Sequence, residues 1–251
     1  MVKVAIVGCN GKMGGFVAQA VQENAACEAL FGVDAFGEGR YNFPVYKTFD
    51  EAAATPDVII DFSNPAALDG MLDYALAHKV PCVICTTGYS QEQIAQIKAA
   101  AEQIAVFYSG NMSLGINLLI ALAKQATKVL GGSFDIEIVE KHHNLKVDAP
   151  SGTALMIADA VSETLENEPQ YVYDRHAYRK KRSKNEIGIH SVRGGTIVGE
   201  HEVIFAGHDE VVTLSHQAQS KEVFAVGAVN AAAFLAAQPA GLYDMGKLIN
   251  A

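Results

Sequence analysis

Residues 1–110 alternate between short apolar runs and helical patterns, and this alternation restricts the fold more than any other feature of the chain. The apolar runs cover 2–7, 28–33, 58–62, 80–85 and 105–108. Helical patterns lie between them at 16–23, 66–78 and 91–101. Strands that alternate with helices predict a parallel sheet covered on both faces, as in Rossmann-type domains.

The pattern changes after residue 110. A long amphipathic helix is predicted at 114–129, a strand at 134–140 and a helix at 153–166. Three runs with antiparallel character follow at 187–193, 199–206 and 210–216, and a last helix is expected at 221–237. The predicted fold class is α/β, with a dinucleotide-binding Rossmann-type domain (1–112 and 218–251) and an α+β substrate-binding and oligomerisation domain (113–217) with a mixed or antiparallel sheet.

Composition excludes several classes of protein. The chain has 251 residues, 50% hydrophobic content and a net charge of -9, so a large core is expected and neither nucleic acid nor an anionic membrane is an expected partner. No apolar stretch reaches the ~20 residues of a membrane span, and residues 1–8 enter an apolar strand directly, so a cytoplasmic location is expected.

Cys82 and Cys85 lie three apart in a predicted strand and therefore point to opposite faces. Buried thiols are favoured there, and no metal site is predicted.

The stretch VAIVGCNGKMGG at 4–15 places Gly8, Gly11 and Gly14 between a predicted strand and a helix. Glycines in this context let a pyrophosphate approach the N-terminus of the helix. Asp34, at the end of the second strand, is placed to accept hydrogen bonds from ribose hydroxyls. Dinucleotide binding is therefore predicted, and the alternative is an ordinary glycine-rich turn.

Three further loops follow strands in this part of the chain, at 61–63, 85–88 and 109–112. Ligands of open α/β sheets bind at the carboxyl ends of the strands, so these loops are candidates for the nicotinamide side of the site. Each loop taken alone is also typical of an ordinary turn.

The stretch EKHHNLKVDAPSGTA at 140–154 gathers titratable and cationic residues directly before a predicted helix. His142 is a candidate proton donor, and Lys146 offers a positive charge for a carboxylate or a developing anion. Backbone N–H groups of Ser151, Gly152 and Thr153, with the Thr153 hydroxyl, could hold a carboxylate. These features favour an anionic substrate. The alternatives are strand-end histidines with surface hydrogen bonds and a plain N-cap.

The segment HHNLKVDAPSGTA closely resembles the signature of the 4-hydroxy-tetrahydrodipicolinate reductase family, also called dihydrodipicolinate reductases. The resemblance extends to GCNGKMG, CTTGY, SGNMSLGIN, RGGTIVGEHEVIFAG and GLYDMGKLI, and so covers nearly the whole chain. It implies that His142 is the proton donor, that Lys146 is essential, and that His143, with Gly152 and Thr153, binds substrate. A departure is Cys85, where many relatives have glycine.

The resemblance also implies the following cofactor-site residues: Gly8, Cys9, Asn10, Gly11, Lys12, Met13, Asp34, Cys85, Thr86, Thr87, Ser109, Gly110, Asn111 and Met112. It implies hydride transfer from NAD(P)H to a cyclic dicarboxylate in lysine and diaminopimelate biosynthesis, and assembly as a homotetramer. NADH is expected to be favoured, because Asp34 repels a 2′-phosphate and no arginine follows it directly. Lys12 and Arg40 keep NADPH as a second, poorer cofactor.

Two other functions are consistent with parts of the sequence. One is a different nicotinamide-dependent dehydrogenase of a small carboxylate, which would not need the HHNLK and PSGT segments together. The other is a non-catalytic, dinucleotide-binding redox sensor that contacts a partner through a basic run. That run consists of Arg175, Arg179, Lys180, Lys181, Arg182 and Lys184.

Overall fold

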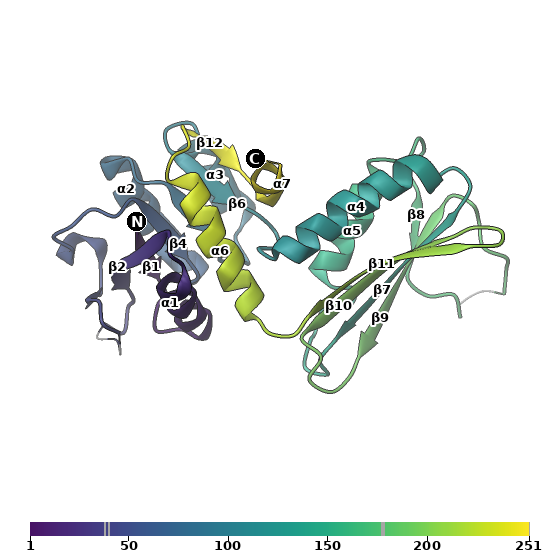
Figure 1. The fold of residues 1–251 in the computed structure, drawn as a ribbon, viewed down its shortest axis with the longest axis horizontal. Coiled ribbons are helices and arrows are strands. Elements are labelled where there is room, and N and C mark those ends of the chain that lie inside the picture. Colours follow the sequence, from purple (N-terminus) through teal and green to yellow (C-terminus); the bar gives the residue numbers. More distant parts are fainter. Residues whose placement is uncertain (38, 40, 177–178, 251) are drawn as a thin grey trace. The chain divides into compact units, whose positions relative to one another are not determined.

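The computed structural model describes residues 1–37, 39, 41–176 and 179–250. The chain divides into two compact units (Figure 1). The first unit comprises Met1–Leu114 and Lys221–Ala251, and the second comprises Gly115–Ser220. Among the described residues, no helix is both long and apolar enough to cross a membrane.

The first unit is built on a seven-stranded sheet in which every pair of neighbouring strands is parallel. The strand order is β12-β6-β5-β4-β1-β2-β3. The strands are β1 (Val2–Val7), β2 (Cys27–Val33), β3 (Val45–Tyr46), β4 (Val58–Asp61), β5 (Cys82–Ile84), β6 (Ala105–Tyr108) and β12 (Gly241–Tyr243). The helices are α1 (Lys12–Glu23), α2 (Leu68–His78), α3 (Gln91–Ala100), α6 (Glu222–Leu235) and α7 (Met245–Ile249), with 3-10 turns η1 (Phe49–Glu51) and η2 (Pro65–Ala67).

Two hydrophobic cores lie on opposite faces of this sheet, because successive strand residues point to alternate sides. In β1, Val4 and Ile6 join the core formed with α1 and α6, whereas Ala5 and Val7 join the core formed with α2 and α3. The doubly covered parallel sheet confirms the predicted Rossmann-type fold class. Cys82 and Cys85 are free thiols that contact different cores, as their spacing predicted.

The second unit contains a mixed five-stranded sheet in the order β11-β10-β7-β9-β8. Its strands are β7 (Asp135–His142), β8 (Gln170–Val172), β9 (Glu186–Arg193), β10 (Gly199–Ala206) and β11 (Val211–Ala218). Its helices are α4 (Leu114–Leu130) and α5 (Gly152–Ser162). Helix α5 ends four residues before the predicted limit of 166.

The runs at 187–193, 199–206 and 210–216 were predicted to pair as antiparallel strands. This prediction is correct for β10 with β11 but wrong for β9. Strand β9 pairs in parallel with β7 and with β8, and β7 separates it from β10. The connection from β7 to β9 contains α5, so the chain crosses over and re-enters the sheet in the same direction. Strands β10 and β11 are joined by a tight turn, in which Gly207 N donates to Glu210 O at 2.8 Å.

The two faces of this second sheet differ in polarity. Ile136 and Ile138 point into a core that also contains residues of α4 and α5. The alternate positions on β7, including Glu137, are half-buried and form a polar face. Because Glu140 and His142 follow Ile136 and Ile138 at every second position, their side chains lie on the helix-covered face.

Five short elements were not predicted: β3, η1, β8, β12 and α7. The three strands have only two or three residues, too few for a period of two to be seen in the sequence. They exist because the edges of longer strands offer their backbone groups hydrogen-bond partners.

Gly227 of α6 allows the helix to contact the loop that carries Met112. A Cβ atom at Gly227 would lie 1.7 Å from Met112 O, whereas a Cβ atom at Gly70 of α2 would meet nothing within 4 Å. We expect Gly227→Ala to lower the free energy of unfolding by about 2 kcal/mol or more, through overpacking against backbone. Gly70→Ala, the matched helical control, should raise it by ~0.5–1 kcal/mol. Urea unfolding of both variants measures this; equal effects would contradict the predicted contact.

Candidate active site

The glycine loop between β1 and α1 depends on two close backbone approaches. Gly8 has a φ of +74°, and a Cβ atom there would lie 2.7 Å from Phe62 O. A Cβ atom at Gly14 would lie 2.1 Å from Gly8 O. Gly11 is the N-cap of α1 and provides no side-chain cap, so the first N–H groups of the helix have no capping side chain. The loop thus has the geometry that presents a helix N-terminus to an anion.

Asp34, directly after β2, is hydrogen-bonded to the glycine loop. Its Oδ2 accepts from Asn10 N at 3.0 Å, and its Oδ1 accepts from Phe36 N at 3.1 Å. The Asn10 amide donates to Gly37 O at 2.9 Å. A carboxylate has about four lone-pair positions, so the two backbone donors leave capacity for ribose hydroxyls. Arg40 lies outside the described residues.

Asp61 connects the loops that follow β4 and β5. It is 1% exposed, and it accepts from Ser63 N at 3.0 Å and from the Tyr89 hydroxyl at 3.1 Å. Ser63 N also donates to Thr86 Oγ1 at 2.9 Å. Burial raises the pKa of Asp61, and the hydrogen bonds from Ser63, Thr86 and Tyr89 oppose this rise. This network fixes Thr86, while Thr87 is exposed beside it.

The loop after β6 is held by its own hydrogen bonds. Ser109 Oγ donates to Asn111 O at 3.2 Å, and Ser113 N donates to Asn111 Oδ1 at 2.8 Å. Met112 is 4% exposed and belongs to the core formed with α6. Strands β4, β5 and β6 are adjacent and parallel, so the predicted loops that follow them lie at one edge of the sheet. The structure therefore brings the predicted cofactor-site residues of the first unit to the carboxyl edge of its sheet.

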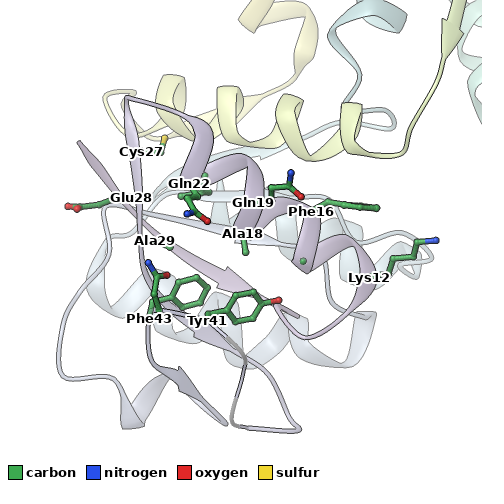
Figure 2. A pocket seen from close by; sticks show the side chains of 13 residues that line it. Lys12, Phe16, Ala18, Gln19, Gln22, Cys27, Glu28, Ala29, Tyr41 and Phe43 are labelled. Carbon is green, nitrogen blue, oxygen red and sulfur yellow. The ribbon is translucent and has the colours of Figure 1, made fainter.

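A cavity of about 700 Å³ lies elsewhere on the first unit, between α1, the start of β2 and residues 41–43. Figure 2 shows Gln19 and Gln22 of α1 on one side and the rings of Tyr41 and Phe43 on the other. Of the predicted cofactor-site residues only Lys12 lines it. The other predicted cofactor-site residues therefore lie outside this cavity.

Glu140 is the centre of the polar cluster in the second unit. Its side chain is fully buried, and it accepts from Arg193 Nη2 at 2.7 Å and from Ser151 N at 3.1 Å. Its Oε2 lies 2.6 Å from His142 Nδ1. Burial alone would raise the pKa of Glu140, but the hydrogen bonds from Arg193, Ser191 and His142 overcome it and lower the pKa to about 2. The cluster therefore contains a permanent buried carboxylate at neutral pH.

That carboxylate decides where the His142 ring carries its proton. Because Nδ1 faces an ionised oxygen, the neutral ring holds its proton on Nδ1, and Nε2 can donate only when the imidazolium forms. Burial lowers the pKa of His142, and Glu140 partly offsets this. A Cβ atom at Gly199 would lie 3.1 Å from His142 Nε2, so the glycine leaves space beside this nitrogen.

His201 packs against His142 with the ring edge toward it, at 5.3 Å between centroids. The Ser151 hydroxyl accepts from Ala154 N at 3.1 Å and lies 3.1 Å from His201 Nε2. Burial and the neighbouring His142 lower the pKa of His201 to about 4, so this ring is neutral at physiological pH.

The other predicted substrate-site residues lie in the loop from β7 to α5. Lys146 Nζ pairs with Asp148 Oδ1 at 2.8 Å. His143 is half-buried, and no described residue provides a hydrogen-bond partner for its Nδ1. Ser151 is the N-cap of α5 and is 2% exposed, whereas Gly152 is exposed and Thr153 half-buried in the first turn. Ser151 therefore caps α5, and its N–H already donates to Glu140.

Three residues of this cluster were not among the predicted site residues: Glu140, Arg193 and His201. Glu140 could have been found from its spacing, because it shares a strand face with His142 at i and i+2. Arg193 and His201 could not, since they depend on strand register. Arg193 is opposite His142 in the β7–β9 pair, and His201 is opposite Glu140 in the β7–β10 pair.

The basic run is partly neutralised by acids of the second sheet. Arg175 pairs with Glu137 at 2.8 Å and also with Glu186. Arg182 pairs with Glu137 at 2.9 Å and with Asp135 at 3.0 Å. Residues 177 and 178 of this segment lie outside the described residues. Pairing with carboxylates weakens the hypothesis that the run binds an anionic partner.

Together the two units define a two-domain protein of the Rossmann dinucleotide-binding class, whose second domain carries a buried ionic cluster. Residues 2–112 match the family model described as "Dihydrodipicolinate reductase, N-terminus", and residues 115–249 match "Dihydrodipicolinate reductase, C-terminus". The chain belongs to the dihydrodipicolinate reductase family.

Individual relatives agree with this assignment. The chain is 54% identical to a 4-hydroxy-tetrahydrodipicolinate reductase of Caldanaerobacter subterraneus, covering 99% of this chain and 98% of the relative. It is 45% identical to a 4-hydroxy-tetrahydrodipicolinate reductase of Clostridium tetani, covering 100% of this chain and 98% of the relative. The solved structure described as "Dipicolinate bound Dihydrodipicolinate reductase from Paenisporosarcina sp. TG-14" is 28% identical in sequence, with a TM-score of 0.80 and 97% of both chains covered.

Glu140 should make an acid-sensitive contribution to stability. Its pKa is about 2 in the folded protein, against ~4.3 in an unfolded chain, so unfolding takes up a proton in this range. The contribution is complete above about pH 5 and is lost as the pH falls towards 2. We expect Glu140→Gln to lower the free energy of unfolding by ~3–5 kcal/mol at pH 7, because Arg193 loses its buried partner.

The measurement is urea unfolding at pH 7, 5 and 3. Glu163→Gln is the control, since its pair with Lys124 is exposed and should contribute less than ~1 kcal/mol. The difference between wild type and Glu140→Gln should shrink as the pH falls. A difference that does not depend on pH would show that Glu140 is not ionised in the folded protein.

Proposed function

We propose that this chain is an NAD(P)H-dependent 4-hydroxy-tetrahydrodipicolinate reductase that produces tetrahydrodipicolinate in lysine and diaminopimelate biosynthesis. The observation that carries the proposal is the joint presence of two features in a member of this family. One is a glycine loop hydrogen-bonded to Asp34, and the other is His142 held by a buried carboxylate near Lys146 and the start of α5.

The cofactor site assigned to the first unit is chemically consistent with a nicotinamide dinucleotide. The pyrophosphate would lie at the N-terminus of α1, where Gly8, Gly11 and Gly14 allow close backbone approach. Asp34 would accept hydrogen bonds from the adenosine ribose. Thr86, Thr87 and the 109–112 loop would contact the nicotinamide half, and the bound cofactor supplies the hydride.

The substrate site assigned to the second unit suits a dicarboxylate. Lys146 provides a positive charge, while Gly152 and Thr153 provide donors at the start of α5. His143 adds a ring with an available nitrogen. Ser151 has a positioning role here, because its backbone and hydroxyl already bind Glu140 and Ala154. That a solved relative is described as dipicolinate-bound supports a small dicarboxylate as the ligand.

His142 would supply the proton of the reduction. Its imidazolium donates from Nε2 to the ring position beside the carbon that receives hydride, and Glu140 holds the ring through Nδ1. The reaction adds one hydride and one proton to the substrate and releases one water, which balances the conversion of the 4-hydroxy compound to tetrahydrodipicolinate.

Assembly as a homotetramer and a cytoplasmic location are also proposed, on the family resemblance.

The direct test is to follow the absorbance of the reduced nicotinamide when the product of the preceding synthase reaction is added to the purified protein. Oxidation of the nicotinamide with formation of tetrahydrodipicolinate supports the proposal. No oxidation with either NADH or NADPH would exclude the proposal and leave two alternatives, a dehydrogenase of another small carboxylate and a non-catalytic dinucleotide-binding protein.

The role of His142 predicts both a rate and a pH profile. His142→Gln should lower kcat by ~10²-fold or more while the Kd for NADH stays near that of wild type. The imidazolium is the donor and burial lowers its pKa, so kcat/KM should fall as the pH rises through an inflection below about 6.5. This inflection should disappear in the variant. The control is His208→Gln, whose ring is exposed at the β10–β11 turn; unchanged kcat in His142→Gln would remove this residue from the chemistry.

Cofactor preference is predicted from Asp34. Its carboxylate should attract both ribose hydroxyls and repel a 2′-phosphate, so kcat/KM with NADH should exceed that with NADPH by a few fold to ~100-fold, on the order of 1–3 kcal/mol. Asp34→Ala should reduce the difference in kcat/KM between the two cofactors, mainly by weakening the binding of NADH. Asp209→Ala should leave this difference unchanged. Steady-state kinetics at fixed salt decide this. A clear preference for NADPH would show that cations such as Lys12 outweigh Asp34.

A further inference from the structure

Asp148 lies in the loop between β7 and α5, against groups that the proposed function assigns to a substrate carboxylate. Its Oδ1 is 2.8 Å from Lys146 Nζ. Lys146 is largely covered, with 22% of its side chain exposed, whereas 56% of the Asp148 side chain is exposed. The carboxylate therefore approaches the ammonium from the solvent side.

The electrostatic environment of Asp148 is that of a bound anion. Hydrogen bonding from Lys146 is the largest cause that lowers the pKa of Asp148, and backbone hydrogen bonds from Asp148 itself and from Gly152 lower it further. Gly152 is the first residue of α5, so its N–H belongs to the positive end of the helix. The side-chain carboxylate thus pairs with Lys146 and is stabilised by the N–H at the start of α5, and these are the two features that we assign to the substrate.

The backbone of Asp148 is held independently of its side chain. Arg193 Nη2 donates to Asp148 O at 2.6 Å, and the same guanidinium is fixed by two hydrogen bonds to buried Glu140. Rotation about the Asp148 side-chain torsions can therefore withdraw the carboxylate while the loop stays anchored. The exposed position gives the withdrawn carboxylate access to water, which reduces the cost of breaking the pair.

We propose that the Asp148 carboxylate is an internal occupant of the carboxylate-binding position formed by Lys146 and the start of α5, and that a substrate carboxylate displaces it. This inference rests on the proposed function, because it assumes that the position receives a substrate carboxylate. Asp148 is then an affinity-determining residue: it keeps Lys146 oriented before binding, and it weakens binding by the free energy needed to displace it.

The first measurement is the Kd of pyridine-2,6-dicarboxylate by calorimetry at saturating NADH. Asp148→Asn, which retains shape but loses charge, should bind this dicarboxylate about two- to tenfold more tightly than wild type, as expected for release from a partly exposed ion pair. Asp148→Ser gives the same test with a smaller side chain. Asp209→Asn, which makes the same change in net charge at an exposed turn, should leave the Kd unchanged.

The second measurement separates displacement from simple repulsion by a nearby charge. In a crystal structure of the wild-type protein with NADH and pyridine-2,6-dicarboxylate, Lys146 Nζ should contact a ligand carboxylate and lie more than ~4 Å from the Asp148 carboxylate. A complex in which Asp148 keeps its contact with Lys146 overturns the inference, even if Asp148→Asn binds more tightly. Equal or weaker binding by Asp148→Asn also overturns it.

The result that would contradict the proposed function differs from the result that would contradict only the inference about Asp148. If wild type and all variants neither bind the dicarboxylate nor oxidise reduced nicotinamide with the synthase product, the assignment of this site to a dicarboxylate is wrong, and the inference about Asp148 falls with it. If wild type binds and turns over substrate but Asp148 is not displaced, only the inference is wrong.

Discussion

The buried ion pair between Glu140 and Arg193 is the interaction on which the second unit's candidate site depends. One carboxylate receives the guanidinium of β9, the first N–H of the turn into α5 and the ring of His142. Each contact satisfies a group whose burial without a partner would be costly. The Glu140 carboxylate of β7 thereby holds β9 and the start of α5 in place. The orientation of the proposed proton donor and of the proposed carboxylate site follows from the same buried charge.

The candidate site of the first unit depends on backbone contacts and not on a buried ion pair. Under the proposed function, main-chain N–H groups at the start of α1 would bind the charged backbone of a dinucleotide, and one acid, Asp34, would bind its ribose. Gly14 is required because any side chain would collide with Gly8 O, and Gly8 adopts a left-handed conformation beside Phe62. Asp34 then ties the end of β2 to Asn10. The loop is held rigidly by backbone contacts, which is the preorganisation that anion binding needs.

Carboxylates serve three distinct roles, which are determined by their burial and by their partners. Glu140 is fully covered and paired, so it stays ionised and positions His142. Asp61 is also covered, but its partners are hydroxyls and one backbone N–H, and its pKa is raised. Asp148 is partly exposed beside Lys146, which leaves it able to exchange its partner. The same functional group is thus a fixed anion, a loop connector and an exchangeable ligand, according to its solvent exposure and its cations.

The sequence by itself determined the βα rhythm, the glycine loop with its acid, and the identity of the loop that carries His142, Lys146 and the start of α5. These features are local: periodicity, turn residues and spacing lie within a few residues of one another. Tertiary structure alone decided that β9 joins β7 in parallel, which brings Arg193 to Glu140, and that β10 places His201 beside His142. Strand order and register depend on how distant segments fill a shared core, so residues about fifty positions apart meet only after that core forms.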